Sequence, residues 1–171
     1  LNNRPGYSKE YQQGKGNDLY RRSIYTFWKR TVPSPMLKTF DAPEREFCTT
    51  RRSRTNTPLQ ALALLNGPQF VEAARRLAER MLSEGGQTLN ERITYGFRLV
   101  TARVPLQSEL TLLRSSYTEN LKLFETNQST AHKLLKVGDS PYNTRLNISK
   151  LAAMTSVARL LLNLNETVTK G

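Results

Sequence analysis

Apolar residues recur at a helical period between positions 106 and 124, and this pattern constrains the fold of the 171-residue chain more than any other feature. Successive members lie three or four positions apart, which places them on one face of an α-helix. They are Leu106, Leu110, Leu113, Tyr117, Leu121 and Phe124. The segment therefore predicts a long amphipathic helix that buries one face against other helices.

A further helix is predicted just after position 56. Thr57 precedes a proline and is followed three positions later by Gln60, which is the arrangement of an N-cap with a capping box. These signals open a helix over 59–65, which Asn66-Gly67 ends. Because that helix is apolar nearly all round, we expect it to be buried.

The next helix is expected over 68–83, with an apolar stripe facing the core and its charged residues facing water. These charged residues are Glu72, Arg75, Arg76, Glu79 and Arg80. A second capping box, formed by Thr88 and Glu91, opens a helix over 89–103.

Two shorter stretches complete the helical half. A polar break over 127–130 precedes a short helix over 131–137, and a turn-rich loop over 139–147 follows it. The last helix, over 148–163, is apolar on more than one face, so we expect it in the middle of the bundle. The sequence thus predicts an all-α protein, an antiparallel helical bundle with short connections.

Residues 1–56 lack this regularity and are rich in basic and aromatic residues. Residues 18–30 fit a short strand or a short helix, and we favour a short helix or an irregular segment. Residues 36–54 are expected to form a long ordered loop, with room for one short strand, that packs on the helices or on another part of a larger protein. We therefore divide the chain into an irregular basic and aromatic segment, 1–56, and a helical bundle, 57–171, within one domain overall.

The net charge of +12 invites a nucleic-acid-binding interpretation. The charge is spread, however, because residues 1–56 hold 12 Lys/Arg and 5 Asp/Glu, and residues 57–171 hold 14 and 9. This spread argues against nucleic acid as a partner and leaves other anionic partners open. The sequence holds no apolar run that is long enough to cross a membrane. Since the chain begins at Leu1, we expect it to be part of a longer protein whose targeting information lies upstream.

Residues that carry chemistry are scarce. Cys48 is the one cysteine, which excludes an internal disulfide, a cysteine-rich zinc site and covalent c-type haem attachment within this chain. We expect Cys48 to be a small buried apolar residue. His132 is the one histidine, and no nucleophile turn flanks it, so we expect it at the surface. The sequence therefore predicts no catalytic residue, no metal ligand and no cofactor in this chain.

The candidate site lies in the basic and aromatic clusters of the first 56 positions. Its members are Arg21, Arg22, Tyr25, Trp28, Arg51, Arg52 and Arg54. Arginines fork onto carboxylates or sulfates and aromatic rings stack on sugars, so this set fits an anion, glycan or docking site.

The alternative, which we favour, is that the arginines are structural and pair with carboxylates. The candidate partners are Asp41, Glu44 and Glu46. Exposed, unpaired arginines would favour a site, whereas arginines paired with these carboxylates would favour an architectural role.

Several runs of the sequence resemble a known family. The most specific run extends from Arg51 to Asn66 (RRSRTNTPLQALALLN) and is followed by residues 68–74 (PQFVEAA). Residues 18–33 and 40–46 add to the likeness. The chain resembles the C-terminal domain of unknown function of large planctomycete-type proteins that also carry a cytochrome-c-like domain.

The resemblance implies a segment of an exported, multidomain bacterial protein in the periplasm or at the cell surface. A haem would belong to an upstream domain, and acidic polysaccharide is an implied ligand class. We expect a non-catalytic C-terminal structural or docking module whose partners are the rest of the parent protein or other envelope proteins. The alternative is part of a polysaccharide-binding, polysaccharide-degrading or haem-linked redox enzyme, to which this chain contributes an arginine- and aromatic-lined wall.

Overall fold

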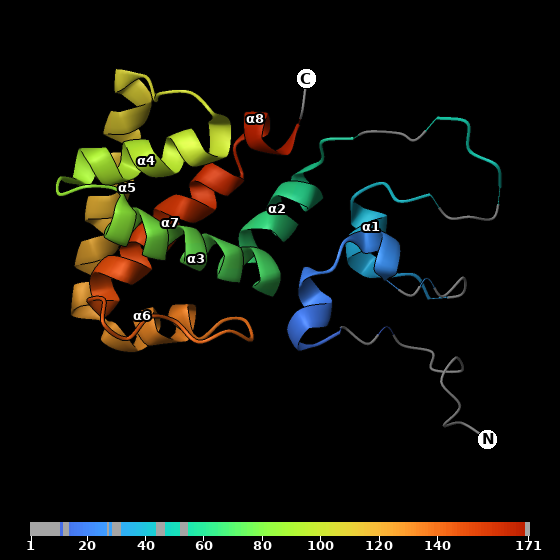
Figure 1. The fold of residues 1–171 in the computed structure, drawn as a ribbon, viewed down its shortest axis with the longest axis horizontal. Helices are drawn as coiled ribbons and strands as arrows, with labels where there is room; N and C mark the ends of the chain where they lie inside the picture. Colours follow the sequence, from blue (N-terminus) through green and yellow to red (C-terminus); the bar gives the residue numbers. More distant parts are fainter. Residues whose placement is uncertain are drawn as a thin grey trace. The chain divides into compact units, whose positions relative to one another are not determined.

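A computed structural model describes residues 11, 14–26, 28, 32–43, 47–51 and 55–169 of the chain (Figure 1). In these residues every regular element is a helix and there is no strand, so the predicted all-α class is confirmed. The elements are η1 (Gly16–Tyr20), η2 (Ser23–Tyr25), α1 (Pro35–Thr39), α2 (Pro58–Asn66), α3 (Pro68–Glu84), α4 (Leu89–Thr101), α5 (Gln107–Thr126), α6 (Gln128–Leu135), α7 (Ile148–Leu162) and α8 (Asn165–Val168).

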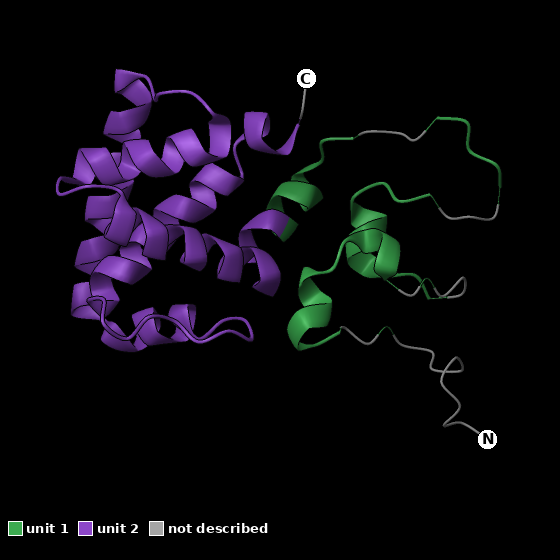
Figure 2. Cartoon of the chain, viewed as in Figure 1, with its two compact units in different colours: residues 1–63 green, residues 64–171 purple. Residues whose placement is uncertain are grey.

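The chain divides into two units, residues 1–63 and residues 64–171 (Figure 2). The boundary falls inside α2, whose first residues belong to unit 1 and whose last residues belong to unit 2. Unit 1 holds the short helices η1, η2 and α1, and unit 2 holds the longer helices.

Helix α7 is the centre of unit 2, as its sequence predicts. It packs against α3, α4, α5 and α6 (Figure 1). The five consecutive residues 151–155 are fully buried, which requires neighbours on every side of the helix. Alanines at 152, 153 and 158 let the surrounding helices approach closely.

Helices α3, α4 and α5 contribute most of the apolar stripes that their spacing predicts, but Leu106 of the predicted α5 stripe precedes that helix and is 63% exposed. Ala74, Ala78 and Met81 come from α3, Ile93 and Phe97 from α4, and Leu113, Tyr117 and Phe124 from α5. Helices α3 and α4 pack most tightly at Gly96, where an added Cβ would lie 2.5 Å from the sulfur of Met81. A glycine in the middle of α4 is therefore explained by this close approach.

Two helices begin where the sequence predicts a capping box. The Thr57 hydroxyl accepts from the Gln60 N–H (3.3 Å), and the Gln60 amide oxygen accepts from the Thr57 N–H (3.0 Å). The second box is formed in the same way by Thr88 and Glu91 (3.2 and 3.0 Å). Both predicted capping boxes are thus confirmed.

Three local predictions are wrong. Helix α2 is not buried, because Leu59 and Leu62 are 61% and 56% exposed and only Gln60 is buried. The segment expected to be a loop over 36–54 contains α1, which begins at Pro35, a residue suited to a first helical turn. Helix α6 starts at Gln128 and not at 131, because the Asn127 side chain caps the Thr130 N–H (3.2 Å).

Among the described residues, no helix has both the length and the apolar character that a membrane crossing requires.

Candidate functional site

Four of the seven predicted site residues lie between positions 21 and 28. Arg21 pairs with Asp18 of η1 (3.2 Å), and both side chains are more than half exposed. Arg22 caps η2, and its carbonyl accepts from the Tyr25 N–H (2.9 Å). Trp28 is half-buried. The structure thus presents Arg21, Arg22 and Tyr25 from one short stretch of 3₁₀ turns.

The predicted arginine cluster over 51–54 is described only at Arg51, since Arg52 and Arg54 lie outside the described residues. Arg51 is exposed, as is Arg22, and neither forms an ion pair with any residue that the structure describes. Within the same residues, no interaction joins Arg51 to the stretch around Arg22. Because Arg52 and Arg54 lie outside the described residues, the arrangement of the two halves of the predicted site stays a prediction.

Large apolar side chains are exposed in unit 1 alongside these arginines. Ile24 is 73% exposed, Tyr25 is 70% exposed and Phe47 is 83% exposed. Exposed apolar side chains also occur in unit 2, where Leu106 and Leu112 are 63% and 71% exposed. Single exposed apolar residues are ordinary, but the adjacent Ile24 and Tyr25, close in sequence to the exposed Arg22, form a surface on which a partner can bury area.

Of the three predicted ion-pair partners of the arginines, the structure describes only one. Glu44 and Glu46 lie outside the described residues. Asp41 has a positive φ of 57° and accepts from the Thr55 N–H (2.8 Å) and hydroxyl (2.9 Å). The Gln60 amide donates to the Thr39 carbonyl (2.9 Å) and to the Thr55 hydroxyl (3.0 Å). Asp41 therefore helps to fasten the chain before α2 to the end of α1.

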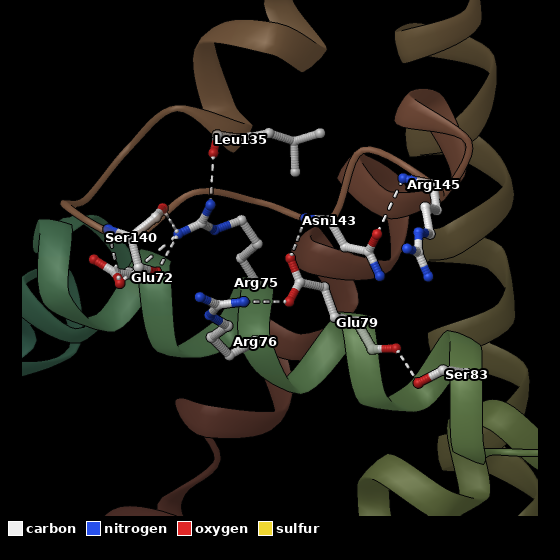
Figure 3. A network of polar contacts seen from close by, with 9 residues as sticks. All are labelled: Glu72, Arg75, Arg76, Glu79, Ser83, Leu135, Ser140, Asn143 and Arg145. Carbon is white, nitrogen blue, oxygen red and sulfur yellow. Dashed lines mark hydrogen bonds and ion pairs between the residues drawn. The ribbon is translucent and has the colours of Figure 1, made fainter.

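A second polar cluster lies in unit 2, where the sequence predicted water-facing charges on α3 (Figure 3). That prediction is wrong for three of the five residues: Glu72, Arg75 and Glu79 are only 2%, 1% and 9% exposed. They lie at i, i+3 and i+7, which is a second helical stripe beside the apolar one. This spacing was the signal that could have identified them as buried.

The buried charges hold the loop between α6 and α7. The Glu72 carboxylate accepts from the N–H groups of Asp139 (2.9 Å) and Ser140 (3.2 Å). The Arg75 guanidinium donates to the carbonyls of Leu135 (3.1 Å) and Ser140 (2.7 Å), and it lies 3.8 Å from Glu72. Opposite charges and main-chain groups thus satisfy one another inside the unit (Figure 3).

Glu79 extends the same network by one helical turn. Its carboxylate accepts from the Asn143 N–H (2.9 Å) and pairs with Arg76 (2.8 Å). Gly138 shows how closely the loop approaches α3, because it has a φ of +96° and an added Cβ would lie 2.1 Å from a carboxylate oxygen of Glu72. These carboxylates accept hydrogen bonds from the main chain of the loop, so the cluster has a structural role: it fastens the loop to α3.

Another ion cluster fastens the turn between α4 and α5 to α8. Arg103 pairs with Glu109 (2.7 Å) and Glu166 (2.9 Å), and its guanidinium lies 4.7 Å from the centre of the Phe97 ring. Hydrogen bonds from Arg103, and then from the Leu106 N–H, lower the pKa of the Glu109 carboxyl to about 2. The same carboxylates raise the pKa of Arg103.

Reactive residues are not gathered anywhere in the described chain. Cys48 is exposed, so the prediction that it is buried is wrong. His132 is half-buried and lies 3.3 Å from the Tyr142 hydroxyl. No group of three or more His, Cys, Asp or Glu residues that could hold a metal ion occurs within the described ranges.

The fold and its surfaces define an all-helical module with a fastened helical unit and a basic, partly apolar N-terminal unit. The chain belongs to the PSD1 family of proteins of unknown function (DUF1553), whose family model matches residues 2–117. No curated protein and no solved structure gives a significant match to the chain.

The family match covers the residues that carry the resemblance, and it ends inside α5. Helices α6, α7 and α8 lie beyond it, although α7 is the centre of unit 2. In this chain the helical unit therefore extends well past the matched residues.

Proposed function

We propose that this chain is a non-catalytic docking module of a larger exported bacterial protein, and that unit 1 supplies the docking surface. The observation that carries the proposal is the exposure of Ile24, Tyr25 and Phe47 in unit 1. Burying one such side chain against a partner contributes roughly 1.5–3 kcal/mol. Burial of these side chains against a partner is therefore favourable in free energy relative to their exposure to water.

The two units have complementary roles in this proposal. Unit 2 supplies stability through its buried helix α7 and its fastened loop. Unit 1 supplies the contact, with Arg22 and Arg51 exposed and outside any described ion pair. An extracytoplasmic location and a haem held by an upstream domain belong to the same proposal.

Hydrogen exchange tests this function directly. The amides of residues 15–26 would be followed in the isolated chain and in the longer protein that contains it. We expect slower exchange in the longer protein, because a docked surface loses access to water. Amides of α7 serve as the control and should exchange equally in both. Equal exchange of residues 15–26 in both proteins would contradict docking.

A binding wall for acidic polysaccharide is the second candidate. It is favoured by one observation, the exposed Tyr25 ring in the same turn as Arg22, which forms no ion pair within the part of the chain that the structure describes. An aromatic ring can stack on a sugar while a guanidinium forms paired hydrogen bonds with a carboxylate. Polygalacturonate, with a neutral glucan as control, is the probe that separates this candidate from protein docking.

A further inference from the structure

We propose that the stretch 15–25, called here the η segment, recognises an acidic peptide surface that presents a large apolar side chain among its carboxylates. This inference rests on the proposed docking function and adds the chemistry of the partner. It follows from three properties of the η segment: its charges, its exposed apolar residues and its hydrogen-bonded backbone.

The charges of the η segment are unbalanced. It holds the cations Lys15, Arg21 and Arg22 and a single acidic residue, Asp18. Asp18 is already paired with Arg21 (3.2 Å). Lys15 and Arg22 are exposed and form no ion pair within the described residues. Carboxylates are the partners that complement two such cations, and a guanidinium binds them through paired hydrogen bonds.

The exposed apolar residues favour a protein over a sugar or a nucleic acid as the partner. Ile24 is 73% exposed and has neither a polar atom nor an aromatic ring. A sugar or a nucleic-acid base is met best by aromatic rings, whereas an aliphatic side chain needs an apolar pocket or another aliphatic group. Tyr25 lies beside Ile24 and offers a ring with a polar tip, a residue type that is enriched in protein interfaces.

The main chain that carries these side chains forms a hydrogen-bonded turn before any partner binds. The Tyr25 N–H donates to the Arg22 carbonyl (2.9 Å), and the Thr26 N–H donates to the Ser23 carbonyl (3.1 Å). Arg22, Ile24 and Tyr25 therefore project from one closed turn. A pre-formed turn lowers the entropy that is lost on binding.

Two labelled peptides test the inference by fluorescence anisotropy against the full chain. One alternates pairs of Glu with Leu, and the other has Ser in place of each Leu. We expect the Glu–Leu peptide to bind more tightly than the Glu–Ser peptide. Arg22→Glu and Ile24→Ser should each weaken its binding by at least about tenfold, since each removes a charge-assisted or an apolar anchor.

Matched controls come from the exposed face of α5. Arg114→Glu makes the same change of charge and Leu112→Ser the same loss of an exposed aliphatic residue, both in unit 2. These variants should change the affinity by less than about twofold, because surface substitutions outside the contact have small effects. Equal weakening by the α5 variants would show attraction by overall charge and would overturn the inference.

Two further outcomes separate this inference from the function on which it rests. Equal binding of the two peptides would overturn the inference, because Ile24 would then have no apolar partner. Protection of residues 15–26 in the longer protein, without peptide binding, would keep docking and reject the acidic partner. Binding of polygalacturonate that depends on Arg22, without peptide binding, would reject both in favour of the glycan site.

Discussion

Arg75 is the largest fully buried side chain among the residues that the structure describes. Its guanidinium is 1% exposed and reaches two carbonyls of the segment 135–140 as well as the Glu72 carboxylate. A buried ion pair of this kind adds little over a well-packed apolar pair, but removal of one partner leaves the other charge buried and unpaired. Loss of Arg75 would therefore destabilise unit 2 by leaving the buried Glu72 carboxylate without this cation.

We expect Arg75→Met to lower the free energy of unfolding by about 3–5 kcal/mol, because Glu72 would remain buried without its cation. Urea unfolding followed by circular dichroism measures this loss. Arg80→Met is the matched control on the same helix, since Arg80 and its partner Glu84 are both about half-exposed, and it should shift the unfolding midpoint much less. A similar loss for the two variants would show that burial of Arg75 is unimportant.

The turn between α4 and α5 shows how one element is tied to another by charge. Arg103 lies in the turn and joins Glu109 of α5 to Glu166 of α8. The pKa of Glu109 falls from its ordinary value of 4.5 to about 2 in the folded protein. The folded state therefore binds a proton less readily than the unfolded state, and this contact stabilises the fold at pH values above 4.5.

The melting temperature of the Glu109→Gln variant, compared with that of the wild type, tests this linkage. The difference between the two proteins should be constant above about pH 5 and should shrink as the pH falls through 4.5 towards 2. Glu119→Gln removes the same charge from an exposed position of α5 that has no ion pair with a described residue. A Glu109→Gln difference that persists at pH 2 would contradict the assignment.

Local patterns in the sequence predict most helices, because helix ends depend on neighbouring residues. Thr57 with Gln60, and Thr88 with Glu91, form the boxes that their spacing indicates. The buried charges of α3 were not predicted, since their partners are main-chain groups more than 60 positions away. A main-chain N–H has no sequence signature, so such a contact is invisible before the fold is known.

The candidate site also combines features that depend on neighbouring residues with features that depend on distant ones. Exposed arginine and aromatic residues near Arg22 could be recognised from composition alone. Whether an arginine is paired depends on long-range contacts, so the expected pairing of Asp41 with arginine stays a prediction. The contacts that the structure describes for Asp41 include those with Thr55 and Gln60. The short side chain of Asp41, in a left-handed backbone conformation, reaches these near neighbours.

At the scale of the whole molecule, α7 decides whether unit 2 folds. It lies outside the family match over 2–117, yet nine of its residues are buried. Small and medium apolar residues fill it, and volume-conserving exchanges among such residues are well tolerated.

A truncation series tests this role. Residues 64–169 should unfold in one cooperative transition, because they contain the complete core of unit 2. Residues 64–117 should show no cooperative transition, since the apolar faces of α3 and α4 would be exposed to water. Thermal unfolding followed by far-UV circular dichroism measures both fragments. A cooperative transition of residues 64–117 would contradict the prediction.

The fastened loop between α6 and α7 also has a practical meaning for protein engineering. Surface loops of this length are the usual places for a purification tag, a fluorophore or a circular-permutation break. Here Asp139, Ser140 and Asn143 each give their main-chain N–H to a buried carboxylate, and Gly138 has no room for a side chain. An insertion would pull these donors away from their acceptors. A foreign sequence is better placed at an exposed position whose main chain is not held in this way.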